Sequence, residues 1–220
     1  MMLAAEIIST GLPVLKFSDT CGFALQLMEE FAVSHLPVTD SDKYAGLIDK
    51  DRLEEQDESK VLEVLQPVLL QLSVADSSHF LFTLKLAAIS NLSLVPVINN
   101  EKELMGCVTR ENIIQTLYPF LSLGDPGGII VLQMEKRDFS LGQLCRLIET
   151  NDAFITQLNT SDNPVTGFLE VTLKINKNEI SDIIATLQRY EYSVKFYIGE
   201  EDYENELKEN YDHLMAYLKM

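Results

Sequence analysis

Basic residues are scarce in this chain of 220 residues. It has 17 lysines and arginines against 34 aspartates and glutamates, which gives a net charge of −17. A surface this acidic repels phosphate backbones and anionic lipid, so we expect neither nucleic acid nor a membrane surface as a partner. Cysteine is scarce too, because Cys21, Cys107 and Cys145 form an odd set without CxxC spacing. Each lies in an apolar segment, which predicts buried free thiols in a reducing compartment.

Long apolar runs are also absent. Residues 128–132 form one of the longest, and a run of this length is far too short to cross a bilayer. The first ten residues, MMLAAEIIST, lack the basic start and the long apolar stretch of a secretion signal. We therefore expect a cytoplasmic protein.

Motifs for catalysis are missing as well. The chain contains neither GxxxxGK[ST] nor GxGxxG, and no serine or cysteine lies in a nucleophile-elbow sequence. His35, His79 and His213 lie in unrelated segments, without the spacing that metal ligation or a catalytic triad would need. We expect a protein that is not an enzyme and that requires no cofactor or metal.

The chain does contain a sequence motif that occurs twice. Residues 34–49 read SHLPVTDSDKYAGLID, and residues 93–109 read SLVPVINNEKELMGCVT. Their prolines, Pro37 and Pro96, lie 59 positions apart, and their glycines lie 60 apart. Each copy of the motif contains two short apolar runs joined by a polar turn, which predicts a strand pair. A segment that predicts a helix follows each copy. Two copies at this period indicate one supersecondary unit used twice, each copy covering the apolar face of the other.

Each repeat is predicted to have the order β-α-β-β-α, in a mixed α+β or α/β fold. Asp19 or Thr20 caps the first helix, whose inward stripe includes Phe31, and Asp49 and Thr109 cap the second helix of each repeat. The predicted elements of the first repeat are 12–17, a helix from about 21, 36–39, 44–48 and a helix to 55; those of the second are 69–72, 78–89, 94–98, 104–108 and 111–117.

The second half of the chain follows a different order. It predicts a ferredoxin-like βαββαβ unit, in which the apolar run 129–134 forms an interior strand buried on both faces. Leu207, Tyr211, Leu214 and Leu218 are spaced as on one face of a helix that packs on its own domain or on a partner. The predicted divisions are 1–58 and 59–118 for the repeats, 119–127 for a linker, 128–200 for the ferredoxin-like unit and 201–220 for a C-terminal helix.

The two repeats resemble cystathionine β-synthase (CBS) domains. The likeness is carried by FSDTCGFALQLM at 17–28, HLPVTDSDKYAGLIDKDRL at 35–53 and LVPVINNEKELMGCVTRENI at 94–113. It implies a disc-shaped pair, often a homodimer, that binds AMP, ATP or S-adenosylmethionine as a regulatory ligand in the clefts between repeats. Residues 128–200 resemble an ACT domain, a regulatory fold that often binds amino acids. The whole succession is similar to AcuB-type acetoin-utilisation proteins.

The resemblance also implies where a ligand would bind. In the CBS pattern G-h-h-T-x-x-D, the hydroxyl meets phosphate and the aspartate meets ribose. The first repeat has Asp49 and Arg52 at these positions; the carboxylate repels phosphate and guanidinium has no acceptor. The second repeat has Thr109 and Asn112, which keep a hydroxyl and one amide acceptor. The expected ligand-binding residues are thus Thr109 and Asn112 flanked by Leu70, Gln71, Val95 and Pro96, with Asp49 and Arg52 as the first repeat's pair.

Two functional hypotheses remain open. One is a regulatory protein whose CBS pair senses an adenosine-containing ligand and transmits the signal to the ACT-like domain. The other is a degenerate, ligand-free scaffold for dimerisation or partner binding, favoured by the substitutions at Asp49, Arg52 and Asn112. Amino-acid binding to the ACT-like unit is disfavoured, because residues 138–142 read DFSLG where ACT domains often carry D-x-P-G.

Overall fold

The computed structural model describes residues 2–9, 11–41 and 43–199. The chain divides into two compact units, of which the first ends at Leu117 and the second begins at Tyr118. The predicted C-terminal helix over 201–220 lies outside the described residues. No helix among the described residues has both the length and the apolar character that a membrane span requires.

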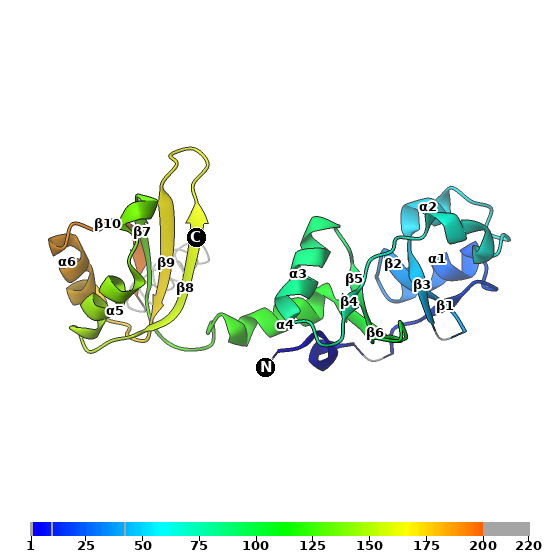
Figure 1. Ribbon diagram of the computed structural model, residues 1–220, viewed down its shortest axis with the longest axis horizontal. Helices are drawn as coiled ribbons and strands as arrows, with labels where there is room; N and C mark the ends of the chain where they lie inside the picture. The colour runs from blue at the N-terminus through cyan, green and yellow to red at the C-terminus, as the bar shows by residue number, and fades with distance from the viewer. Residues whose placement is uncertain (1, 10, 42, 200–220) are drawn as a thin grey trace, which may run out of the picture. The chain divides into compact units, whose positions relative to one another are not determined.

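Unit 1 contains the two predicted repeats, each built on a three-stranded sheet (Figure 1). In both sheets the first strand pairs with the second in parallel, and the second pairs with the third antiparallel. The first repeat consists of β1 (Leu15–Lys16), α1 (Cys21–Glu30), β2 (His35–Asp40), β3 (Lys43–Asp49) and α2 (Lys50–Glu54). The second consists of β4 (Val74–Ala75), α3 (Phe80–Ile89), β5 (Leu94–Ile98), β6 (Leu104–Thr109) and α4 (Arg110–Phe120). Short 3-10 helices, η1 (Ala4–Ile7) and η2 (Leu62–Val68), precede the two repeats.

Local capping explains where the helices begin. The Thr20 hydroxyl accepts a hydrogen bond from the Phe23 amide at 3.2 Å, and Asp49 accepts one from the Arg52 amide at 2.9 Å. Each bond satisfies one of the amides that a helix start leaves unpaired. The predicted inward position of Phe31 is wrong, because α1 ends at Glu30 and Phe31 is 39% exposed.

The predicted strand over residues 69–72 is also wrong. The second repeat's own first strand is β4, and the preceding Leu70 pairs instead with the first repeat. The Leu70 amide donates to the Leu47 carbonyl at 2.8 Å, and the Leu47 amide donates to the Leu70 carbonyl at 2.9 Å. Because β3 uses both backbone groups of Leu70, they cannot join the second repeat's ladder. The first repeat's opening strand is likewise shorter than the predicted 12–17.

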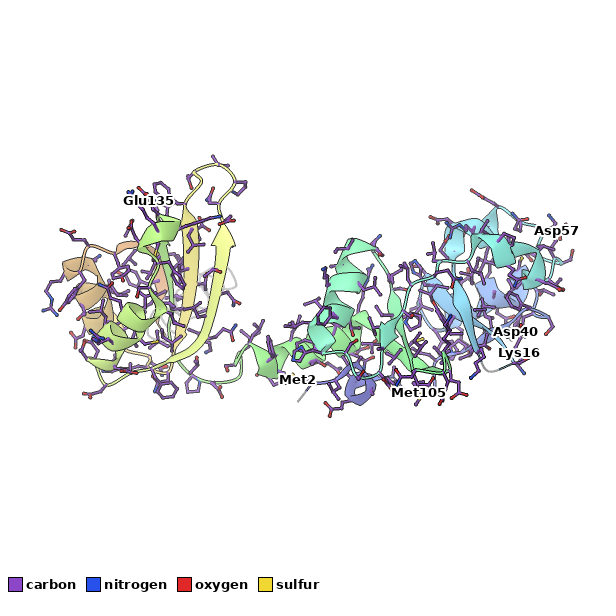
Figure 2. All side chains as sticks on the ribbon, viewed as in Figure 1. Met2, Lys16, Asp40, Asp57, Met105 and Glu135 are labelled. Carbon is purple, nitrogen blue, oxygen red and sulfur yellow. The ribbon has the colours of Figure 1, made fainter. Side chains whose placement is uncertain are left out.

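The segment ahead of the first repeat makes the reciprocal exchange. Ser9 pairs antiparallel with Cys107 on β6, with its amide 2.8 Å from the Cys107 carbonyl. Further back, Met2 lies beside the second repeat (Figure 2), and its carbonyl accepts from the Phe80 amide at 2.9 Å. Each repeat therefore extends the sheet of the other, and one apolar core is continuous across both.

Unit 2 has the predicted βαββαβ order. It consists of β7 (Ile129–Met134), α5 (Leu141–Glu149), β8 (Ile155–Asp162), β9 (Leu169–Ile175), α6 (Ser181–Arg189) and β10 (Ser193–Ile198), with a short 3-10 helix, η3 (Lys136–Asp138), before α5. The antiparallel sheet has the order β10-β7-β9-β8, so β7 is interior as expected. Helices α5 and α6 lie on one face of this sheet (Figure 1) and share its apolar core.

The prediction that β7 is buried on both faces is wrong. Ile130, Leu132 and Met134 are buried, but Ile129 and Val131 between them are only half-buried. In the described part of unit 2, both helices cover the same face, so a continuous apolar run is buried on alternate residues only.

We predict that Gly106→Ala destabilises unit 1. Gly106 has φ +148°, which a side chain makes unfavourable, and an added Cβ would collide with Ile8 of the exchanged segment. We expect the free energy of unfolding, from urea denaturation followed by circular dichroism, to fall by at least about 2 kcal/mol. Gly142→Ala is the control, because nothing lies within 4 Å of its added Cβ and it sits in a helix, where alanine is favoured. Equal stability of Gly106→Ala and the unaltered protein would contradict the close packing.

Candidate ligand-binding cleft

A cavity of about 570 Å³ lies between the two repeats of unit 1. Its volume is within the range of roughly 300–1,000 Å³ typical of small-molecule sites. Both repeats and the segment that joins them contribute to its walls. The lining residues are Ser34, His35, Asp49, Lys50, Asp51, Arg52, Leu70, Ser90, Asn91 and Arg110.

The cleft has an excess of positive charge in an otherwise acidic chain. Lys50, Arg52 and Arg110 line it, against the carboxylates of Asp49 and Asp51. Lys50 and Arg110 hold equivalent places in the two repeats, since each is the first residue of the helix that follows the strand pair. The duplicated fold thus brings the starts of α2 and α4 to the same cavity.

Arg110 is the most firmly positioned of these cations. Its Nε donates to the Leu92 carbonyl at 2.8 Å, and one Nη donates to the Asn91 carbonyl at 3.0 Å and to Asn91 Oδ1 at 2.8 Å. These acceptors are uncharged, so they orient the guanidinium without neutralising it. A planar, oriented guanidinium suits a phosphate or carboxylate group.

Asp49 and Arg52 form a pair within the cleft. Asp49 Oδ1 accepts from the Arg52 amide, and Asp49 Oδ2 lies 2.7 Å from Arg52 Nη1. The carboxylate therefore has the predicted capping role and also holds the arginine side chain against α2. Arg52 keeps 37% of its side chain exposed, so it is partly neutralised but still reachable.

Thr109 and Asn112 make the corresponding pair in the second repeat, and they are hydrogen-bonded to each other. Asn112 Oδ1 accepts from the Thr109 backbone amide at 3.1 Å and from the Thr109 hydroxyl at 2.6 Å. The backbone amide of Asn112 in turn donates to that hydroxyl at 3.2 Å. This is a reciprocal cap at the start of α4. Neither residue is among those that line the cavity.

The structure divides the sequence-predicted site residues into two groups. Asp49, Arg52 and Leu70 line the cleft together. The others lie elsewhere: Val95 and Pro96 are buried in β5, and the Gln71 side chain donates from Nε2 to the Ala45 carbonyl at 2.6 Å in a separate cavity. Leu70 joins the first repeat's pair because it is bonded to Leu47, two residues from Asp49.

Comparison with known proteins agrees with this architecture. The model of the CBS domain family matches residues 4–55. The matched residues cover the first repeat. Among solved structures, the chain is similar to a CBS domain pair/ACT domain protein from Thermotoga maritima, with 20% identity, coverage of 55% of this chain and 99% of that one, and a TM-score of 0.50. At this identity the likeness shows the fold alone, which for unit 1 is a CBS pair.

Two further solved structures are similar at lower TM-scores. CBSX2 in complex with AMP has 22% identity, covers 55% of this chain and 98% of its own, and has a TM-score of 0.44. The CBS domains of a transcriptional regulator from Streptococcus pneumoniae have 18% identity, cover 52% and 98%, and have a TM-score of 0.46.

His35 joins the two CBS repeats at the edge of the cleft, a role that its sequence position does not reveal. Its Nδ1 lies 3.1 Å from the Ser93 hydroxyl oxygen and accepts from the Ser93 amide at 3.3 Å. The Ser34 amide also donates to that hydroxyl, at 3.0 Å. Because the Ser93 amide can only donate, Nδ1 must carry no proton. Arg110 and Lys50 were missed as well, although each directly follows an expected site residue, Thr109 or Asp49.

The thiols and acidic groups of the chain form no reactive or metal-binding cluster in the described ranges. Cys21 and Cys107 are buried, as predicted, and burial raises the pKa of the Cys107 thiol to about 12. Such a thiol is not nucleophilic near neutral pH. Cys145 is half-buried rather than buried. Within 2–9, 11–41 and 43–199, no three His, Cys, Asp or Glu side chains gather as they would around a metal ion.

We predict that acid weakens the CBS pair through His35. Burial, and secondarily the Arg110 charge, lowers the pKa of His35 below its ordinary value of 6.5, although the Asp49 and Asp51 carboxylates oppose the shift. The unfolded chain then binds more protons than the folded one, so stability falls as pH drops through about 6.5. His35→Asn keeps an acceptor at the Nδ1 position but cannot titrate.

The test is the free energy of unfolding in urea, measured between about pH 7.5 and 5.5. We expect similar values for both proteins at the higher pH and a shallower decline for His35→Asn; taking the difference between the two proteins cancels what unit 2 and the carboxylates contribute. Identical pH profiles would show that His35 does not link the repeats in this way.

Proposed function

We propose that this chain is a non-enzymatic regulatory protein that binds an adenosine-containing anion, AMP or ATP, in the cleft between its CBS repeats. The observation that carries this proposal is the excess of positive charge in the cleft of a protein whose net charge is −17. CBS domains commonly bind adenosine ligands, and residues 4–55 match that family. The free thiols of Cys21 and Cys107 suit a cytoplasmic protein.

The composition of the cleft favours nucleotides over S-adenosylmethionine. Arg110 is fixed by uncharged acceptors and stands at the first residue of α4, an 11-residue helix whose start favours negative charge. Leu70 contributes an apolar side chain to the lining, so we propose that it packs against the adenine base. S-adenosylmethionine brings a sulfonium cation and no phosphate, so it would gain less from these groups.

A ligand here would act on the arrangement of the repeats. The walls of the cleft come from both repeats, so the ligand binds one relative arrangement more tightly than another and shifts the equilibrium toward it. Helix α4 begins at Arg110 in the cleft and continues past Leu117 to Phe120, where unit 2 has begun. It is the continuous element through which we propose the signal reaches the ACT-like unit, in a homodimer of the AcuB type.

One observation favours the second candidate function, a ligand-free scaffold for dimerisation or partner binding. Thr109 and Asn112 hold the positions that would meet phosphate and ribose in the second repeat, yet their hydroxyl and amide oxygen are bonded to each other. Under this alternative, the same closure extends to the first repeat, where Asp49 and Arg52 are paired.

Titration calorimetry of ligand-free protein with AMP, ATP and S-adenosylmethionine tests the proposal. We expect ATP and AMP to bind, and Arg110→Gln to weaken them at least about tenfold because it removes an oriented charge. Arg110→Lys should restore part of the affinity, and Arg146→Gln, at an exposed site in α5, is the control. If none of the three ligands binds, the nucleotide proposal is wrong and the ligand-free scaffold is the remaining function.

A matched pair of charge changes locates the ligand. Asn91→Asp places a carboxylate against Arg110 inside the cleft, so we expect nucleotide affinity to fall at least about tenfold. Asn112→Asp makes the same chemical change at a residue that does not line the cleft, so we expect affinity to stay within about twofold. A gain of affinity in Asn112→Asp would instead place the ligand at the Thr109 pair of the second repeat.

A further inference from the structure

The sheet of unit 2 has an apolar surface on the side away from its helices. Side chains alternate along a strand, and directly paired residues point to the same side of a sheet. Ile130 points into the core under α5 and α6, so Ile129 and Val131 point to the other side, which we call the open face. Their direct partners in β10 are Ile198 and Phe196, which therefore lie on the open face as well.

These four apolar residues form a patch two strands wide, the β7–β10 patch. Phe196 is 53% exposed, and the other three are half-buried. The next strand, β9, continues the open face with polar residues. Its Lys174, the partner of Ile129, is buried and donates to the Asp125 carbonyl at 2.6 Å. The segment before β7 thus accounts for the lysine, but α5 and α6 lie on the opposite side of the sheet from the patch (Figure 1).

The residues that come shortly after β10, beyond the described ranges, have an amphipathic sequence. Residues 200–220 read EEDYENELKENYDHLMAYLKM. Glu209 and Asp212 fall on the other side of a helix from an apolar stripe whose members are spaced four, four, three and four. A helix gains most of its stability by packing such a stripe on another apolar surface. The stripe consists of Tyr203, Leu207, Tyr211, Leu214 and Leu218.

We propose that residues 203–218 form a helix whose apolar stripe packs on the β7–β10 patch. The chain leaves β10 at Ile198, which is itself part of the patch, and residues 199–202 give a connection of the usual length. A helix over 203–218 is about 22 Å long, and the six residues of β7 span about 20 Å. Among the described residues β7 is covered on one face only, and this helix covers the patch on the other.

Tethering and charge favour this segment over a second copy of the chain. A short connection holds the segment near the patch at an effective concentration on the order of millimolar. A second copy that presented its own patch would also bring its residues 200–212, seven of which are Asp or Glu, close to the same residues of the first. Those carboxylates would repel one another, whereas in the proposed packing they face water. The inference is independent of the nucleotide proposal, because the patch lies wholly in unit 2.

Hydrogen exchange of the full chain, followed by mass spectrometry, tests this packing. We expect the amides of residues 208–218 to exchange at least about tenfold more slowly in the unaltered protein than in Phe196→Glu, whose carboxylate would be buried under the helix. Tyr197→Glu is the matched control. Tyr197 is the next residue of β10 and is 51% exposed, but its partner Ile130 places it on the opposite side of the sheet. It should leave the protection unchanged.

A second pair of variants changes the segment and leaves the described sheet intact. Leu207→Glu removes a member of the stripe, so we expect it to lose the protection of residues 208–218. Asn205→Glu adds the same charge on the other side of the helix and should retain the protection. Circular dichroism confirms that unit 2 folds in every variant, and the segment pair decides the question if Phe196→Glu does not fold.

Four outcomes would overturn the inference. They are fast exchange of residues 208–218 in the unaltered protein, protection that withstands Phe196→Glu and Leu207→Glu, protection lost in Tyr197→Glu, and protection that disappears when the protein is diluted. The last of these would assign the patch to a second copy. Because no ligand is added, failure of the nucleotide proposal leaves each of these results unchanged.

Discussion

The two repeats are held together by backbone exchange, and the rest of unit 1 depends on it. Leu70, ahead of the second repeat, pairs with Leu47 of the first, and Ser9, ahead of the first, pairs with Cys107 of the second. The chain approaches so closely at these points that the facing residue must be glycine: a Cβ on Gly46 would lie 2.7 Å from that of Leu69. Separating the repeats would expose both ladders and a shared core, so they behave as one body.

The cleft is a consequence of this exchange. Pairing with Leu47 sets Leu70 beside Asp49 and Arg52, and the duplicated fold brings Lys50 and Arg110 to one cavity. His35 then bonds to Ser93 across the seam, so the group that joins the repeats also borders the space where a ligand would bind. Under the proposed function, ligand binding would therefore be coupled to the relative position of the repeats through residues that serve both.

The two repeats have diverged on both their inner and outer sides. On the inside, the cap at the start of the second helix is an ion pair facing the cleft in one repeat and a closed Thr109–Asn112 pair in the other. On the outside, acidic residues such as Glu54 stand where the second repeat has apolar ones such as Ile114. The proposed ligand site follows this divergence, because the first repeat contributes most of its lining residues.

Local features of this protein could be read from its sequence, and non-local ones could not. The strand pairs, the caps at Thr20 and Asp49 and the βαββαβ order of unit 2 follow from neighbouring residues, since turns, caps and periodicity act over a few positions. Sequence could not show that Leu70 joins β3, because its apolar neighbours suit either sheet. Nor could it show that Arg110 faces the cleft or that β7 is covered on one side. Those outcomes depend on which distant segment competes successfully for a backbone edge or an apolar face, and only the assembled tertiary structure decides that competition.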